Sequence, residues 1–466
     1  MPWFTASLFT VAFCHRPLTF SPIEVCAVTY DVIVCGGGTA GSVAAIAAAR
    51  QGADVRIVEQ FGFLGGSQTG GLVLPMMSFT TGDQVLVGGL NEEIIERCNA
   101  LPGDNEGIFF NFELLKYVLE DMALEAGCKL QYHTFVSDAR VRNGRLEAVE
   151  TVSKSGKQWL EARQFIDATG DADVAVMAGV PYESGRPEDG LNQSAGLRFV
   201  VAGVDLQALA DFLTAHGRPC PNPARFGWGF ARGGVGDSPL ERLAAQAEAD
   251  GVFSAEEGGY IQFFTVPGRP GDVAFNCPRI THINGARVED LTRAQVEGRK
   301  IIPKIMEFCR RYLAGFDHAY LSTTAPMVGI RESRRIVGEY VLSADDFRAA
   351  RKFEDGIARS CYPIDIHNPS GVGVTLERLP EGEYHEVPYR CLVPLRVDDL
   401  LVAGRCISAT FEAQAAIRIE ATCRAMGEAA GVAAALCVRE GVSPRNLDTT
   451  QLLEVLRSQG AKVHGA

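Results

Sequence analysis

The hydrophobic pattern of the chain becomes regular at Thr29. Residues 29–35 (TYDVIVC) are a β-branched apolar run with the length of a buried strand. The glycine-rich GGGTAG follows, and the small residues of 42–52 (SVAAIAAARQG) predict a helix. Residues 54–59 (DVRIVE) are a second buried run that ends in an acidic residue. Strand, glycine turn, helix and strand together predict one βαβ unit of about thirty residues.

Later segments continue the alternation of strands and helices. Residues 110–128 have helical periodicity, whereas 130–165 predict short strands joined by turns at RNGR and SKSGK. Two further buried strands, 165–170 (FIDATG) and 399–405 (DLLVAGR), each include a glycine near the end. A long helix of small residues is predicted over 413–438.

Size and composition limit the class of protein. A chain of 466 residues is too long for one simple core, and we expect two domains with intertwined segments. Its 50 glycines favour close approaches of the backbone, as around a large cofactor. The net charge of −13 argues against nucleic acid or an anionic membrane surface as a partner, but allows a local basic pocket. The apolar run AAGVAAALCV is too short to span a bilayer, so we predict no integral membrane segment.

The cysteines and histidines give no sign of a disulfide framework or a metal site. The 13 cysteines are scattered without a C-x-x-C pair, which predicts reduced thiols in a cytoplasmic enzyme. No two histidines have metal-ligand spacing, so we predict no metal. Residues 1–28 lack a positive charge before SLFTVAF. We interpret them as a disordered extension or a wrongly chosen start, with a secretory signal as the weaker alternative.

The motif G-x-G-x-x-G opens the first predicted helix and indicates a dinucleotide site. Gly36 makes the tight turn, Gly38 lets a pyrophosphate approach the backbone, and Gly41 lets helix and strand pack closely. The helix N-terminus offers N–H groups to the phosphates. Glu59, at the end of the second strand, can accept both hydroxyls of an adenosine ribose. The candidate contacts are Gly36, Gly38, Thr39, Ala40, Gly41 and Glu59.

The segment after Glu59 distinguishes FAD from NAD. Residues 60–72 (QFGFLGGSQTGGL) contain five glycines besides small polar residues, a composition suited to a backbone that wraps an extended cofactor. An NAD dehydrogenase has no need of a second glycine-rich loop at this point. The alternative interpretation is a flexible surface loop. We therefore predict FAD as the cofactor.

These motifs together resemble those of a known family. The chain resembles FAD-dependent oxidoreductases of the glutathione-reductase-like superfamily, and is distantly similar to fumarate reductase flavoproteins. The resemblance covers residues 29 to about 450 and rests on YDVIVCGGGTAGSVAAIAAARQGADVRIVEQ, FIDATGDADVA, GIRESRRIVGEY, YPIDIHNP and LLVAGRCISAT. Further cofactor contacts that it implies are Gly65, Gly66, Ser67, Gly170, Asp171, Gly404 and Arg405.

The resemblance also implies how FAD is held near the flavin. The helix starting near Ala413 would point its N-terminus at the flavin O2 edge. Relatives with covalent FAD use a histidine in the loop after the ribose acid, and residues 60–72 contain neither His nor Cys, which implies non-covalent FAD. Members of the group often have a histidine where this chain has Phe411, so another group must supply any acid–base chemistry.

The pattern and the resemblance lead to one fold class and one domain plan. We expect an α/β protein with a Rossmann-like FAD-binding domain, whose parallel sheet is built from 29–175 and 396–466. The irregular region 176–395 carries most of the Pro, His and Trp, and predicts an inserted α+β substrate domain.

Three aspartates in FIDATGDADVA raise the question of a calcium loop. Counted from Asp167, the positions that need glycine and glutamate are Ala172 and Ala178, so a calcium loop is excluded. We expect Asp171 or Asp173 to cap the helix that begins next.

The candidate catalytic residues are His367, Asp365 and Arg331. In YPIDIHNP, Asp365 and His367 would lie on one face of a strand, where the carboxylate orients the imidazole and raises its pKa. The alternative is a structural strand end. At helical spacing Arg331, Arg334 and Arg335 would share a face, either to clamp a carboxylate or to form internal ion pairs.

Hydride transfer between FAD and a small polar organic substrate, such as a hydroxy acid or sugar, is the function favoured. The second interpretation is a redox-neutral flavin-dependent hydratase, lyase or isomerase, and the third is an FAD-binding subunit of a redox complex. A region of about 200 residues that can build a substrate pocket favours an enzyme over a subunit. The substrate and the electron acceptor or donor cannot be read from the residues.

Overall fold

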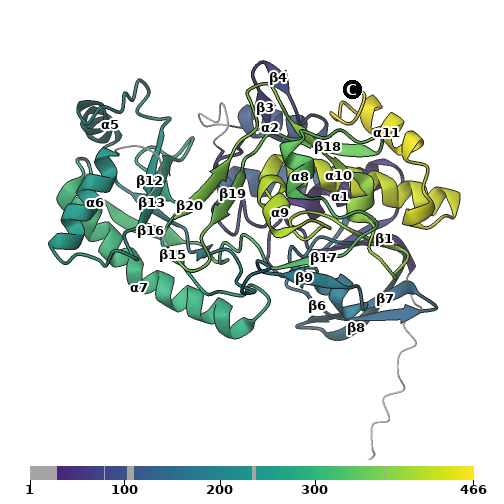
Figure 1. Cartoon of the computed structure of the whole chain (residues 1–466). Helices are drawn as coiled ribbons and strands as arrows, with labels where there is room; N and C mark the ends of the chain where they lie inside the picture. Colours follow the sequence, from purple (N-terminus) through teal and green to yellow (C-terminus); the bar gives the residue numbers. More distant parts are fainter. Residues whose placement is uncertain (1–28, 78, 102–109, 233–237, 372) are drawn as a thin grey trace, which may run out of the picture.

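The structure is a computed structural model that describes residues 29–77, 79–101, 110–232, 238–371 and 373–466. It has two lobes, and Figure 1 shows that both ends of the described chain, in purple and yellow, share one lobe. The middle of the chain, in teal, forms the other lobe. The extension predicted for residues 1–28 lies outside the described residues.

The larger sheet has seven strands and contains the predicted βαβ unit. Its strands are β1 (Thr29–Cys35), β2 (Val55–Val58), β5 (Lys129–Gln131), β6 (Phe135–Arg142), β7 (Arg145–Ser153), β8 (Gly156–Asp167) and β22 (Leu400–Val402). Their order is β5-β2-β1-β8-β7-β6, with β22 also paired to β8. The pairs among β5, β2, β1, β8 and β22 are parallel, whereas β6 and β7 extend the sheet in antiparallel pairing. The strands predicted at 29–35, 54–59, 165–170 and 399–405 are confirmed.

The register of this sheet brings the carboxyl ends of four strands together. Cys35 lies opposite both Val58 and Asp167, and Asp167 lies opposite Val402. In a parallel sheet, the loops that follow aligned strand ends meet at one edge, where such folds bind their ligands. The four segments that follow β1, β2, β8 and β22 are therefore neighbours although they are far apart in sequence.

Two helices of small residues pack together beside this sheet. They are α1 (Thr39–Arg50) and α10 (Glu420–Glu440), and almost every side chain in both is buried. A Cβ added to Gly427 would lie 2.2 Å from the Ala40 carbonyl oxygen, and one added to Gly431 would lie 2.1 Å from that of Ala44. The two backbones approach so closely because glycines stand at the contact.

The long helix predicted over 413–438 is wrong in its extent. The structure has α9 (Phe411–Ile417) and then α10, separated by Arg418 and Ile419. Ile419 has an extended backbone, and the Arg418 side chain donates to the carbonyl and carboxylate oxygens of Asp365. The break re-aims the chain, so that α10 rather than the Ala413 helix begins beside the cavity described below.

The smaller lobe is built on an antiparallel sheet of five strands with the order β12-β13-β14-β11-β16. These strands are β11 (Phe199–Ala202), β12 (Gly227–Ala231), β13 (Tyr260–Thr265), β14 (Val273–Phe275) and β16 (Tyr320–Thr324). Three helices accompany the sheet, namely α5 (Leu206–Ala215), α6 (Pro239–Ala249) and α7 (Val288–Tyr312). This lobe has a separate hydrophobic core, in which Phe199 stacks on Phe275. The domain boundaries at 175 and 395 stay a prediction.

Short elements complete the fold. The helices are α2 (Leu90–Ala100), α3 (Phe112–Glu125), α4 (Asp173–Met177), α8 (Ala344–Arg348) and α11 (Thr449–Ser458), with 3-10 turns at Tyr389–Leu392 and Pro444–Asn446. The paired strands are β3 (Thr80–Thr81) with β4 (Gln84–Val85), β9 (Tyr182–Ser184) with β17 (Arg334–Ile336), β10 (Ala195–Gly196) with β15 (Arg279–Ile280), β18 (Gly356–Ser360) with β21 (His385–Pro388), and β19 (Ile364–His367) with β20 (Val374–Glu377). The helix predicted within 110–128 is confirmed as α3.

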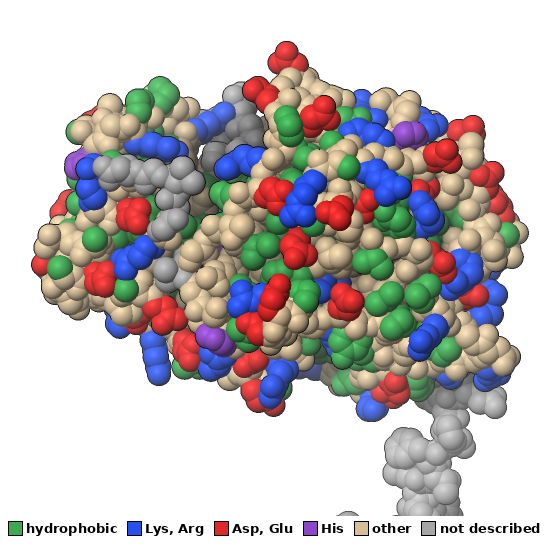
Figure 2. All heavy atoms as spheres, viewed as in Figure 1, with side chains coloured by type: hydrophobic (Ala, Val, Ile, Leu, Met, Phe, Trp, Pro, Cys, Tyr) green, Lys and Arg blue, Asp and Glu red, His purple; other side chains and the backbone are tan. Residues whose placement is uncertain are grey.

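The described part of the chain shows how its apolar helices, its cysteines and its possible metal ligands are arranged. There, α10 is the one helix long and apolar enough to cross a membrane, and 94% of the relevant stretch is buried inside the protein. All eleven described cysteines are free thiols. Within the same residues, no group of three or more His, Cys, Asp or Glu side chains could hold a metal ion. Acidic and basic side chains are interspersed over the face seen in Figure 2.

Candidate active site

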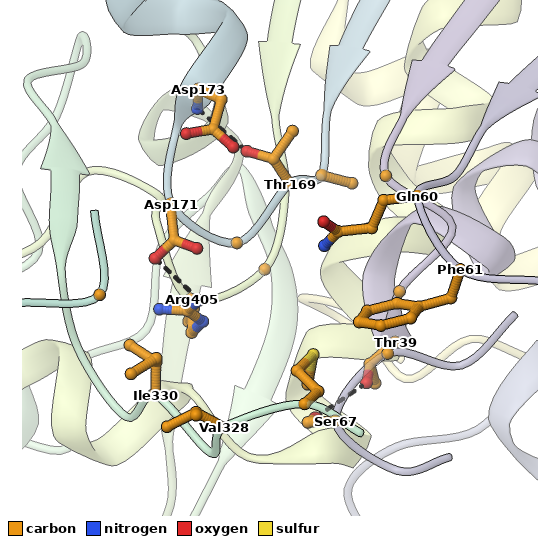
Figure 3. Close-up of a pocket in the computed structure, with 18 of the residues that line it drawn as sticks. Thr39, Gln60, Phe61, Ser67, Thr169, Asp171, Asp173, Val328, Ile330 and Arg405 are labelled. Carbon is orange, nitrogen blue, oxygen red and sulfur yellow. Dashed lines mark hydrogen bonds and ion pairs between the residues drawn. The ribbon is translucent and has the colours of Figure 1, made fainter. Parts of the chain in front are cut away.

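One cavity of about 640 Å³ lies where the four aligned strand ends meet. Gly36, Glu59, Thr169 and Gly404, one residue from each loop, contribute to its wall. The cavity continues to the smaller lobe, where residues 326–331 and the beginning of α7 line it. Figure 3 shows Thr39 and Ser67 near one another, with Asp171 and Arg405 across the opening and Val328 and Ile330 beside them.

The first glycine motif forms a tight turn at the cavity wall, called the cradle below, in which Gly36 and Gly41 leave no room for a side chain. Gly36 has a φ of +93°, and a Cβ there would lie 2.6 Å from the Ala168 carbonyl oxygen. A Cβ on Gly41 would lie 1.8 Å from the Gly36 carbonyl oxygen, so Gly41 packs the helix against the turn rather than lining the cavity. Gly38 is the N-cap of α1 and brings no side chain to the helix N-terminus, which faces the cavity.

Glu59 is fixed at the cavity wall by two backbone donors. Its carboxylate oxygens accept from the N–H groups of Gly37 at 2.7 Å and Phe61 at 2.8 Å. Burial raises the pKa of Glu59, and these two hydrogen bonds oppose the rise. Each oxygen keeps a lone pair for a ligand hydroxyl, as the sequence predicts for this position.

The second glycine-rich loop rests on the first. The Gly65 N–H donates to the Gly37 carbonyl at 2.9 Å, and Thr39 Oγ1 donates to the Gly65 carbonyl at 3.2 Å. A Cβ on Gly66 would lie 2.8 Å from the Gly38 Cα. Gly66 and Ser67 line the cavity, whereas Gly65 supports them from behind. The loop is therefore held against the cradle and does not project as a free surface loop.

The predicted helix cap in FIDATGDADVA is wrong. Neither Asp171 nor Asp173 caps α4; instead the buried Asp167 accepts from the N–H of Ala175 at 2.8 Å. The other Asp167 oxygen accepts from the hydroxyl and N–H of Thr169. Ala172 has a left-handed backbone that turns the chain. The carboxylate of Asp167, rather than that of Asp171 or Asp173, therefore accepts from a free N–H group in the first turn of α4.

Asp171 instead forms an ion pair at the cavity. Its Oδ1 accepts from Arg405 Nη2 at 2.9 Å and from the Ser333 hydroxyl. Gly170 has a φ of +82°, and a Cβ there would lie 3.1 Å from the Arg405 guanidinium. Gly170, Asp171, Gly404 and Arg405 all line the cavity, so the structure brings together the four contacts expected from these loops.

The arginines of GIRESRRIVGEY do not share a helical face. Arg334 and Arg335 lie in the short strand β17, whose pairing with β9 outweighs the local helical spacing. Arg334 pairs with Asp173, and the buried Arg335 pairs with Glu332, so both are structural. Arg331 alone of the three lines the cavity, and its Nη1 donates to the Ser194 carbonyl at 2.5 Å.

Asp365 and His367 lie on one face of β19, as predicted, but neither lines the cavity. His367 Nε2 is 3.3 Å from Asp365 Oδ2, and Asp365 also accepts from Tyr362 and Arg418. The predicted rise in the pKa of His367 is wrong. Burial and the nearby Arg331 lower that pKa well below its usual value and outweigh Asp365. His367 is therefore a neutral, buried side chain behind the cavity wall.

Three charged residues at the cavity were not predicted. Arg198, Arg418 and Glu420 line it, the last at the first position of α10. They come from segments more than 200 residues apart, and no local motif marks them. Phe411, which stands where relatives often have histidine, is buried beneath Arg335 and does not reach the cavity.

The aligned loops, the glycine cradle and the carboxylate of Glu59 are the features of a dinucleotide-binding protein. The chain belongs to the FAD dependent oxidoreductase family, whose model matches residues 31–456. It is an enzyme of the oxidoreductase class, and its cofactor is FAD. The cavity fits this cofactor, because the N-terminus of α1 is open to it at Gly38, where an added Cβ would meet nothing closer than 3.7 Å, and because Glu59 offers acceptors for ribose hydroxyls.

Named relatives are geranylgeranyl reductases and similar proteins rather than fumarate reductase flavoproteins. A digeranylgeranylglycerophospholipid reductase of Methanocella arvoryzae is 28% identical over 220 residues, 44% of this chain and 52% of that protein. Digeranylgeranylglycerophospholipid reductase 1 of Methanopyrus kandleri is 32% identical over 151 residues, 30% of this chain and 40% of that protein. This chain thus spans about half the length of the curated relatives it matches, or less.

Comparison with solved structures also finds matches at low sequence identity. A geranylgeranyl bacteriochlorophyll reductase-like protein of Thermoplasma acidophilum is 14% identical, with a TM-score of 0.43. The similarity covers 92% of this chain and 84% of that one.

Proposed function

We propose that this chain transfers a hydride between non-covalently bound FAD and an organic substrate that occupies the end of the cavity nearest the smaller lobe. The observation that carries the proposal is the continuity of the cavity. The wall of this one cavity includes the cradle at Gly36 and the acid at Glu59 as well as Val328 and Ile330. A cofactor seated on the cradle would therefore share one cavity with a substrate.

The residues of the cavity divide into cofactor and substrate contacts in this proposal. When bound, FAD supplies a position, N5, that accepts or donates hydride. The N-terminus of α1 binds the pyrophosphate, Glu59 the ribose, and the Asp171–Arg405 pair closes the opposite side. The proposed cofactor contacts that line the cavity are Gly36, Gly38, Thr39, Ala40, Glu59, Gly66, Ser67, Gly170, Asp171, Gly404 and Arg405, and Gly41 and Gly65 support the two glycine loops from behind.

Glu420 is the group we propose for proton transfer. It lines the cavity and lies close enough to Arg198 and Arg418 to interact with their charges. Burial raises its pKa, against the opposing effect of Arg198 and Arg418, so its carboxyl can hold a proton at higher pH than an exposed glutamate. Arg331, which lines the cavity, orients the substrate, and the Asp365–His367 pair positions Arg418 from behind.

Two kinds of substrate would fit the charged and the apolar parts of the cavity wall, respectively. Small polar molecules such as hydroxy acids or sugars suit the charged residues Arg331 and Glu420. A carbon–carbon double bond in an apolar chain is the second candidate, because the wall near the smaller lobe includes Val288, Leu291 and Val328. The names of the relatives, reductases of a digeranylgeranylglycerophospholipid, favour this second candidate. A distant relation to fumarate reductase flavoproteins and a cytoplasmic location remain parts of the proposal.

Anaerobic photometry of the FAD-loaded protein tests the proposal. A panel of hydroxy acids, sugars and amines is mixed with oxidised protein, and a panel of prenylated alkenes is mixed with protein that has been photoreduced. Bleaching by a member of the first panel, or reoxidation by a member of the second, supports hydride transfer and gives its direction. Turnover after reduction without net oxidation of the substrate would establish the redox-neutral alternative. No spectral change with either panel would leave an FAD-binding subunit as the better explanation.

A further inference from the structure

Three guanidinium groups converge on the end of the cavity nearest the smaller lobe. Arg198 precedes β11, Arg331 follows the loop 326–330, and Arg418 stands between α9 and α10. All three line the cavity, although they come from three distant segments of the chain. The fold thus concentrates positive charge at one place in a protein whose net charge is −13.

These guanidinium groups have few acceptors within the protein. Among the described residues, Arg198 has no hydrogen-bond acceptor or carboxylate within bonding distance. Arg331 donates to one backbone carbonyl, that of Ser194. Arg418 contacts Asp365, but its Nε is buried without an acceptor among the described residues. Since a guanidinium has five N–H donors, most of this bonding capacity is left for a ligand.

The charges of this arginine cluster do not balance. Arg331 lies close enough to Arg198 and Arg418 to interact with their charges, whereas the carboxylates beside the three guanidinium groups are two, Asp365 and Glu420. His367 does not add to the positive charge, because burial and Arg331 lower its pKa. Buried charges of one sign are costly unless a partner neutralises them. The arrangement is therefore suited to a bound anion.

The site of Arg198 is shaped by glycine. A Cβ added to Gly329 would lie 2.5 Å from Arg198 Nη1, so the guanidinium occupies space that glycine leaves open. Gly329 also pairs with Gly196 through two backbone hydrogen bonds, at 2.8 and 3.2 Å. These bonds fix the loop 326–330 over the arginine. The guanidinium is thus held at the cavity wall by the backbone around it.

We propose that Arg198, Arg331 and Arg418 form a subsite that binds an oxyanion of the substrate, a carboxylate or a phosphate. This inference rests on the proposed function, because it assigns the substrate of the same cavity a negative group. Arginine suits the role, since its planar fork donates two parallel hydrogen bonds to either oxyanion. The apolar wall of Leu291 and Val328 then receives the rest of the molecule.

Anion titration of the FAD-loaded protein tests the subsite without turnover. Sodium succinate and sodium phosphate are the probes, in a buffer free of oxyanions, with ionic strength held constant by sodium chloride. Binding is followed by the flavin difference spectrum and by calorimetry. We expect saturable binding, with Arg198→Met raising the Kd about tenfold or more, since charge-assisted hydrogen bonds are lost. Arg198→Lys should give an intermediate Kd, because the charge remains and the fork is lost.

Two further variants control the experiment. Arg218 is exposed and does not line the cavity, so Arg218→Met matches the charge change and should leave the Kd unchanged. If Arg198→Met does not fold, Gly329→Ala displaces the guanidinium without removing it and should weaken anion binding in its place. Tighter binding of succinate than phosphate would assign a carboxylate, and the reverse order a phosphate.

Three results would refute the subsite. The first is the absence of saturable anion binding to the wild-type protein, and the second is equal anion binding by wild type and Arg198→Met. The third is loss of FAD rather than of the anion by Arg198→Met, since the guanidinium would then bind the cofactor. Because the titration uses oxidised protein at rest, its failure leaves hydride transfer intact. Failure of the photometric panels with normal anion binding would instead remove only the hydride proposal.

Discussion

The contact between α1 and α10 makes a strong prediction for the variant Gly427→Ala. The new methyl group would lie 2.2 Å from the Ala40 carbonyl oxygen, so the two helices must separate by roughly 1 Å to reach ordinary contact. Overpacking of this kind costs about 1–3 kcal/mol, whereas alanine gains about 1 kcal/mol over glycine in a helix interior. Because the methyl group meets backbone at 2.2 Å, the cost lies at the upper end of this range, about 3 kcal/mol, and we expect a net loss of about 2 kcal/mol in the free energy of unfolding.

The same shift should weaken FAD binding, because Ala40 lies in the first turn of α1 and lines the cavity. We expect the Kd of FAD to rise by about tenfold, since 1.4 kcal/mol corresponds to that factor. Flavin fluorescence measures FAD release during dilution and during urea unfolding. Urea is preferable to heat, since about 1 kcal/mol moves the thermal midpoint of a chain this long by only about 1 °C.

Gly431→Ala is the matched control for this experiment. Its methyl group would lie 2.1 Å from the Ala44 carbonyl oxygen, one turn further along α1 and away from the cavity. It should lower stability by a similar amount and change FAD affinity less. Wild-type stability in both variants would show that the helices are not packed through these glycines. Equal losses of FAD affinity would show that the first turn of α1 has no special role.

Three other variants follow from individual carboxylates. Burial raises the pKa of Glu428 from 4.5 to about 7. Between these pH values the folded protein binds a proton that the unfolded chain releases. The free energy of unfolding therefore falls by roughly 3 kcal/mol as the pH rises through this range. Urea midpoints of Glu428→Gln should lack this slope, and an unchanged slope would contradict the assignment. Glu59→Gln sets an amide NH2 against the N–H of Gly37 or Phe61, and fluorescence titration should show FAD binding weakened about tenfold; unchanged affinity would argue against a ribose contact. Glu420→Gln should lower the hydride-transfer rate about 100-fold and remove the ionisation of Glu420 from the pH dependence of that rate. An unchanged pH dependence would assign the proton transfer to another group.

The cofactor loops could be predicted from sequence because their signals are local. A strand, a glycine turn and a helix need only a few neighbouring residues, and the run from β1 to Glu59 forms as the pattern indicates. The second glycine-rich loop lies against the first through hydrogen bonds to Gly37 and Thr39, and its contact with a cofactor stays a prediction. Such segments depend little on the rest of the chain.

The substrate side could not be predicted because long-range packing decides it. Asp365 and His367 were placed on one face correctly, but whether that face meets a cavity depends on Arg331 and Arg418, which stand in front. The break after α9 carries no local signal, since residues 417–420 (IRIE) contain neither glycine nor proline. Arg198 meets the other arginines only after the smaller lobe has folded against the larger.

The placement of β8 has a consequence for synthesis. Its last residues pair with β1, made early, on one side and with β22, made some 230 residues later, on the other. Until β22 and α10 leave the ribosome, the nascent chain exposes an unpaired strand edge and the apolar face of α1. The cofactor fold therefore closes only after β22 and α10 have been made, and we expect chaperone demand to last until then.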